Sequence, residues 1–123
     1  MSYLEQLETE RTQRLLDVAV RTYGVERQAM HLMEEAAELV VALSHVMRGR
    51  QLPTTELPGE VADVLIMVGQ FVKRYGLEAE VKHALETKLG RLHARIQSKW
   101  CWEIDLNEED PLAEVPGFKE HSE

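Results

Sequence analysis

Five acidic residues lie in two short clusters, and each cluster leads into an apolar stretch. Residues 34–38 have the sequence EEAAE and residues 60–63 have EVAD. Residues 39–47 form the first apolar stretch. The second covers residues 61–72, where Asp63 is the only charged residue. Carboxylates that converge in apolar surroundings are costly unless they share protons or bind a cation. The two clusters therefore predict a cation site, built from Glu34, Glu35, Glu38, Glu60 and Asp63.

Helical spacing places these acids next to one another. Glu35 and Glu38 are three residues apart and neighbour each other across one helical turn, and Glu60 and Asp63 repeat that spacing. Two antiparallel helices can thus bring four carboxylates to one point. Oxygen ligands favour a hard cation over zinc, namely Mg²⁺ with Mn²⁺ as a substitute. The alternative is a solvated acidic face, which the flanking apolar sequence makes the less favoured interpretation.

The doubled acidic pattern resembles the signature of a known superfamily. Glu34-Glu35-x-x-Glu38, then 21 residues, then Glu60-x-x-Asp63 is similar to the motif of the all-α nucleoside triphosphate pyrophosphohydrolases. That group includes the MazG proteins, all-α dUTPases, dCTP pyrophosphatases and phosphoribosyl-ATP pyrophosphohydrolase. The resemblance covers roughly residues 26–99. It implies an all-α fold, a four-helix MazG-like bundle whose core is completed by dimerisation, and often a tetramer.

The resemblance also implies a reaction and a role for each acid. Glu35, Glu38, Glu60 and Asp63 would bind Mg²⁺, and Glu34 would orient or deprotonate the attacking water. Hydrolysis between the α and β phosphates would give a nucleoside monophosphate and pyrophosphate, in a house-cleaning role on nucleotide pools. Mg²⁺ would be needed because the triphosphate brings negative charge to an already acidic site.

A stripe of basic residues lies along one face of the expected last helix. Lys88, Arg91, Arg95 and Lys99 fall within a sector of about 80° on a helix. Lys88, Arg91 and Arg95 are the favoured candidates for binding substrate phosphates. The alternative is a solvated face whose cations lie toward the helix C-terminus, where the helix dipole favours them.

Histidine and aromatic residues supply weaker candidates. His31 lies one turn before Glu34, so contact with substrate is possible, although a structural or surface role is favoured. Tyr23, Tyr75, Trp100 and Trp102 are candidates for stacking on a base, and burial is at least as good an interpretation.

Composition limits the class of protein. The chain has 123 residues, the size of one domain, with 44% hydrophobic and 29% charged residues, which is typical of a globular protein. A net charge of -8 argues against nucleic-acid binding. The apolar runs are too short to span a membrane, and a single cysteine fits a reducing compartment. We therefore expect a cytoplasmic protein with no nucleic-acid or membrane partner.

Periodicity and helix-stop residues predict four helices, over residues 2–23, 26–48, about 55–75 and 77–99. In the first, the predicted period is marked by Leu4, Leu7, Arg11, Leu15 and Val18. Ser2 is the expected first N-cap, and Thr54 or Thr55 the expected N-cap of the third helix. Residues 1–99 form the predicted MazG-like domain. Residues 100–123 form an irregular tail in which tryptophans dock and the rest stays mobile.

The second and third helices are too apolar for a monomer of this size to bury completely, which predicts a homo-oligomer, dimer or tetramer. Two function classes follow from the sequence. The favoured one is the Mg²⁺-dependent pyrophosphohydrolase. The alternative is a non-catalytic helical module that binds metal or nucleotide, or acts as an adaptor.

Overall fold

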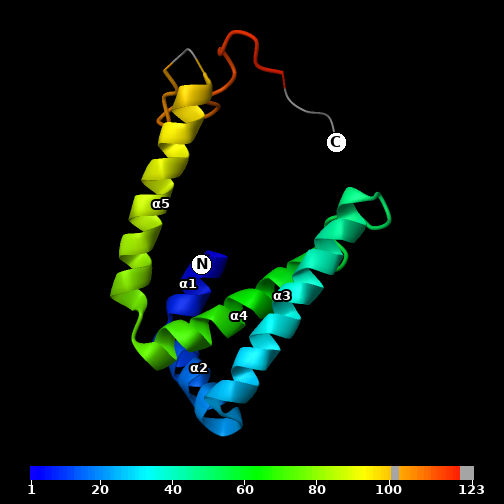
Figure 1. Cartoon of the computed structure of the whole chain (residues 1–123), viewed down its shortest axis with the longest axis vertical. Helices are drawn as coiled ribbons and strands as arrows, with labels where there is room; N and C mark the ends of the chain where they lie inside the picture. Colours follow the sequence, from blue (N-terminus) through cyan, green and yellow to red (C-terminus); the bar gives the residue numbers. More distant parts are fainter. Residues whose placement is uncertain (101–102, 120–123) are drawn as a thin grey trace. The chain divides into compact units, whose positions relative to one another are not determined.

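All regular structure in the described part of the chain is helical. A computed structural model describes residues 1–100 and 103–119, and Figure 1 shows its helices. They are α1 (Tyr3–Glu8), α2 (Glu10–Tyr23), α3 (Val25–Met47), α4 (Leu57–Tyr75) and α5 (Glu78–Lys99). The all-α prediction is confirmed. Contacts divide the chain into two compact units, residues 1–81 and 82–123, and each is described by itself.

The expected first helix is interrupted, which corrects the prediction of one continuous helix. Ser2 caps α1 as predicted, in a capping box with Glu5. The backbone of Thr9 is extended, with ψ of 147°, and its hydroxyl accepts a hydrogen bond from Thr12 N at 3.2 Å. Threonine favours this N-cap role because its oxygen satisfies a free N–H of the first turn. Thr9 therefore ends α1 and starts α2.

The buried face of α2 also differs from the predicted one. Leu16 and Val20 are buried, whereas Leu15 and Val18 are exposed. The buried face packs on α4, where a Cβ added at Gly69 would lie 3.0 Å from Leu16 Cδ1. The missing side chain at Gly69 thus makes room for Leu16. The residues predicted to mark the helical period, Leu15 and Val18, instead face solvent on the same helix.

The helices α3 and α4 form the most extensive helix–helix contact of the first unit and run antiparallel, joined by residues 48–56 (Figure 1). Their register is fixed by a buried hydrogen bond of 2.8 Å from Gln28 Nε2 to Gln70 Oε1. One turn toward the C-terminus of α3 therefore corresponds to one turn toward the N-terminus of α4. This register positions the candidate site.

The start of α4 departs from the predicted threonine cap. The N-cap is Glu56, and no side chain caps the helix, although Pro58 falls in the first turn as expected. The Glu56 carboxylate instead accepts a hydrogen bond from Gln51 Nε2 at 2.8 Å and lies 3.4 Å from His45 Nδ1. Together these partners lower the pKa of Glu56, with the Gln51 hydrogen bond as the largest cause.

The apolar stretches of α3 and α4 are not covered within one chain. Val40 and Met47 of α3 are each 68% exposed, and Ile66 and Val68 of α4 are also exposed. This exposure agrees with the expectation that a single chain cannot bury these two helices completely. No helix in the described ranges is long and apolar enough to cross a membrane.

The second unit contains most of α5 and the described part of the tail. No residue of α5 is buried, and its apolar residues Leu85, Leu89, Leu92 and Ile96 are exposed in the single chain.

Part of the tail is packed. Ile104 and Val115 are buried, and the rings of Trp100 and Phe118 meet edge to face with centroids 5.8 Å apart. The docking predicted for Trp100 is thus observed, while Trp102 lies outside the described residues. Apolar side chains other than the tryptophans are therefore packed as well.

Candidate metal centre and adjoining pocket

Three of the predicted acids converge between α3 and α4. One carboxylate oxygen from each of Glu35, Glu38 and Glu60 lies within 4.8 Å of the others. The two α3 acids are one turn apart, and the antiparallel register brings the first turn of α4 beside them. The cluster is therefore built from two rigid elements.

The electrostatics of the cluster favour the binding of a cation. Burial is the largest cause of the raised pKa of Glu60. The charges of Glu38, Asp63 and Glu35 raise this pKa further, as does a hydrogen bond with the Glu38 carboxyl. The Oε2 atoms of Glu35 and Glu60 are buried with no hydrogen-bond partner in the described ranges. Buried acceptors normally have partners, so a cation would satisfy both the charge and the oxygens.

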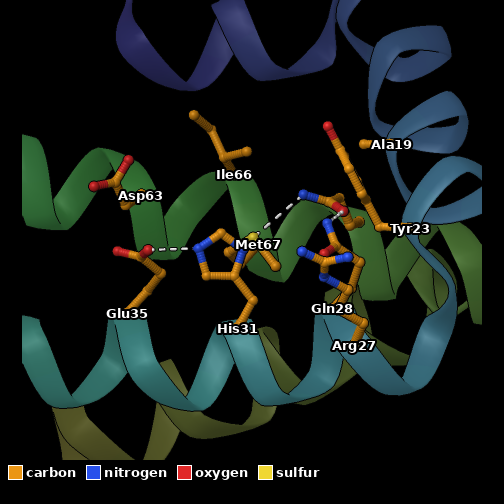
Figure 2. Close-up of a pocket in the computed structure, with 10 residues that line it drawn as sticks. Ala19, Tyr23, Arg27, Gln28, His31, Glu35, Asp63, Ile66 and Met67 are labelled. Carbon is orange, nitrogen blue, oxygen red and sulfur yellow. Dashed lines mark hydrogen bonds and ion pairs between the residues drawn. The ribbon is translucent and has the colours of Figure 1, made fainter.

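Asp63 and Glu34 have different positions relative to this cluster. Asp63 is exposed and lines a pocket together with Glu35. It lies across from Glu35 in Figure 2, and its charge acts on Glu60. Glu34 is exposed and belongs neither to the three-carboxylate group nor to the pocket lining. Its role at the attacking water stays a prediction.

His31 contacts a carboxylate of the cluster. Its Nε2 lies 2.8 Å from Glu35 Oε1, and the Glu35 side chain is only 13% exposed. The bond fixes one oxygen of Glu35, while the other oxygen is the buried, unpartnered one. Sequence reasoning related His31 to Glu34 and missed Glu35, although the four-residue spacing on one helix was the available signal.

The pocket beside the cluster has a volume of about 440 Å³ and is lined by α2, α3 and α4. In Figure 2 its two ends differ. Glu35 and Asp63 lie at one end, which we call the carboxylate end. Tyr23 and Gln28 lie at the other end, where Gln28 pairs with Gln70; we call it the amide end. Neither glutamine was singled out from the sequence.

The basic candidates all lie in the second unit. Lys88, Arg91 and Arg95 are exposed on α5 and line one surface depression with Ala94. They are therefore close to one another, as the helical spacing predicts. Their relation to a substrate phosphate stays a prediction.

The donor set of the cluster fits a hard divalent cation. Carboxylate oxygens are the ligands that Mg²⁺ and Mn²⁺ accept, and two such oxygens are buried without partners. Comparison of the chain with protein-family models, curated proteins and solved structures gave no match. The functional argument therefore depends on the site itself and on the acidic motif.

Proposed function

We propose that this protein is a Mg²⁺-dependent nucleoside triphosphate pyrophosphohydrolase, which cleaves the α–β phosphate bond of ribo- or deoxyribonucleotides. One observation carries the proposal. Glu35, Glu38 and Glu60 converge from the two helices that bear the acidic motif, and they leave two buried oxygens without partners. An unpaired carboxylate cluster of this kind is costly to maintain without a cation.

In the proposed mechanism, Glu35, Glu38, Glu60 and Asp63 would hold Mg²⁺. When bound, the metal would neutralise charge on the triphosphate and lower the pKa of water. Glu34 accepts a proton from the attacking water. The water oxygen then bonds to the α-phosphorus, the bond from that phosphorus to the α–β bridging oxygen breaks, and pyrophosphate leaves with the electron pair.

Other residues support the proposed reaction. His31 positions Glu35 through the 2.8 Å contact. Lys88, Arg91 and Arg95 are proposed to bind phosphate groups, because they are cationic and line one depression of α5.

We further propose a homo-oligomer, dimer or tetramer. Large apolar side chains of α3, α4 and α5 are exposed in the single chain, and exposed apolar patches commonly mark interfaces. Mass measurement in solution tests this, and a monomer at micromolar concentration would contradict it.

Product analysis tests the proposed reaction. Wild-type protein, incubated with a panel of NTPs and dNTPs and Mg²⁺, is expected to release a monophosphate and pyrophosphate. Glu38→Gln should abolish this release because it removes a metal ligand. Glu109→Gln, which changes an exposed acid of the tail, is the matched control and should retain activity. Release of orthophosphate would show that another bond is cut and would refute the proposal.

The position of Glu34 favours one alternative, a module that binds metal and nucleotide without turnover. Glu34 is outside the carboxylate cluster, and an enzyme needs a base near its water. Binding of Mg²⁺ and a non-hydrolysable triphosphate, with no product from any nucleotide of the panel, would support this alternative.

A further inference from the structure

The helices α3 and α4 carry a second matched pair of residues two turns away from the acids. Gln28 precedes Glu35 by seven residues, and Gln70 follows Asp63 by seven. Seven residues are nearly two helical turns, so each glutamine shares a helix face with its acid at an axial distance of about 10 Å. The antiparallel register then sets the two glutamines opposite each other. The pocket therefore has an anionic end and a hydrogen-bonding end, where the two uncharged amides lie beside the Arg27 guanidinium.

The glutamines at the amide end keep unused hydrogen-bonding groups. Gln28 and Gln70 are the two buried polar residues of the described chain, 5% and 3% exposed. Gln28 Nε2 donates to Gln70 Oε1 at 2.8 Å, and Gln70 Nε2 donates to the sulfur of Met67 at 3.3 Å. Thioether sulfur is a weak acceptor, and each amide has two N–H groups and two acceptor lone pairs. Donor and acceptor capacity thus remains in residues that line the pocket.

The walls around these amides suit a flat ring. Tyr23 offers an aromatic face, and the Arg27 guanidinium lies 5.7 Å from its ring centroid. Ala19, Ile66 and Met67 supply apolar surface in the same pocket. Nucleobases combine stacking faces with an edge that carries both donors and acceptors, and proteins bind them with aromatic or apolar faces and polar edge contacts.

We infer that the amide end binds the nucleobase of the substrate, and that Gln28 and Gln70 determine base specificity. This inference rests on the proposed function, because the phosphates would occupy the carboxylate end. The axial distance of about 10 Å leaves room for a sugar between a phosphate at the carboxylate end and a base at the amide end. The substrate class is therefore a nucleotide whose base is read, rather than a simple polyphosphate.

Isosteric substitutions test the inference. Gln28→Met and Gln70→Met keep the volume of the side chain and remove its hydrogen bonds. We expect the ratio of kcat/KM between the best and worst bases of a dNTP panel to fall at least about tenfold, because a buried edge contact is lost. Mg²⁺ affinity, measured by calorimetry without nucleotide, should be unchanged. Unchanged base ratios in both folded variants would overturn the inference.

A binding measurement separates this inference from the proposed reaction. Nucleoside 5′-monophosphates, added to wild type without Mg²⁺, should shift the side-chain amide NMR signals of Gln28 and Gln70. Glu38→Gln should keep this response while it loses Mg²⁺ binding. If added monophosphate shifts other NMR signals but neither of these amide signals, the base site is refuted, even if hydrolysis is observed. Amide shifts without hydrolysis of any triphosphate would retain the base site and refute the reaction.

A third variant covers the case in which the buried substitutions unfold the protein. Tyr23 is 55% exposed, so Tyr23→Leu should preserve the fold while removing the aromatic face. We expect monophosphate affinity to fall about tenfold, since stacking on an aromatic side chain contributes strongly to base binding. An unchanged monophosphate affinity in this variant would count against the amide end as the base site.

Discussion

Two groups of acids in this protein have similar charge and opposite surroundings. The tail acids occupy residues 103–114, and two of them accept hydrogen bonds within their own turns. Asp105 Oδ1 accepts a hydrogen bond from Asn107 N at 2.9 Å, and Asp110 Oδ1 accepts one from Leu112 N at 3.2 Å. The carboxylates between α3 and α4 instead converge from two helices and leave two buried oxygens unpaired. Acid density alone therefore does not define a cation site, whereas unpaired oxygens held by two rigid elements favour one.

The largest expected contrast between the two groups is in catalysis. Glu60→Gln removes a proposed metal ligand and should lower nucleotide hydrolysis by more than about 100-fold, since even outer-sphere changes cost 10–100-fold. Glu109→Gln in the tail should leave the rate unchanged. Pyrophosphate release with Mg²⁺ measures both. Equal losses in the two variants would remove the distinction between the groups.

The next contrast is in stabilisation by metal. At one hundred times its Kd, Mg²⁺ should raise the free energy of unfolding of the wild type by about 2.7 kcal/mol. Glu60→Gln should lose this gain. Without metal it should be more stable than wild type, because it removes charge repulsion at a carboxylate whose Oε2 atom is buried. Thermal unfolding with Mg²⁺ and with chelator measures both effects. A metal-free variant less stable than wild type would contradict this account.

The pH dependence follows from the raised pKa of Glu60. The folded state holds this proton more tightly than the unfolded chain, whose pKa is near 4.5. The contribution of Glu60 to metal-free stability is therefore greatest below that pH and is lost as pH rises through the folded pKa. Mg²⁺ binds the ionised form, so its stabilising effect should grow over the same interval.

Unfolding midpoints recorded at several pH values, with and without Mg²⁺, measure this dependence. Glu60→Gln is the control and should flatten the metal-free curve. If Glu60 instead makes the metal-free wild type more stable as pH rises, the pH dependence has the opposite sign and contradicts this account.

A smaller effect is expected at the histidine beside the cluster. His31→Ala removes the 2.8 Å contact with Glu35 and should weaken Mg²⁺ binding about tenfold, the usual cost of losing a residue that orients a ligand. His83→Ala changes an exposed histidine of α5 and should have no effect. Calorimetric titration with Mg²⁺ compares them. Identical affinities would show that Glu35 needs no orienting partner.

The smallest effect is expected in the tail. Asp110→Ala removes the hydrogen bond to Leu112 N and should cost about 1 kcal/mol or less. The loss should be the same with and without Mg²⁺, as chemical denaturation can show. A Mg²⁺-dependent loss would mean that the tail acids also respond to the cation.

Much of the fold could be predicted from local signals. Ser2 caps the first helix as expected, and the helix-stop glycines Gly24 and Gly76 end α2 and α4, because caps depend on neighbouring residues. The buried face of α2 could not be predicted in this way. Leu16 is buried because Gly69 of another helix leaves room for it, and this depends on tertiary contact.

The candidate site also has one part that local sequence predicts and one part that it does not. The carboxylate end was predicted because its charges interrupt apolar sequence and repeat at helical spacing. The amide end was missed because glutamine is uncharged and its partner is 42 residues away. Only the register of α3 against α4 reveals that Gln28 and Gln70 meet.

That register also determines where the chain can change length. Residues 48–56 join the two helices, and lengthening such a connection costs little, about 0.6 kcal/mol for each doubling. One residue inserted between Asp63 and Gln70 would instead rotate the glutamine by about 100° about the helix axis. Insertions and deletions should therefore be tolerated in the connection and rejected between the two ends of the pocket.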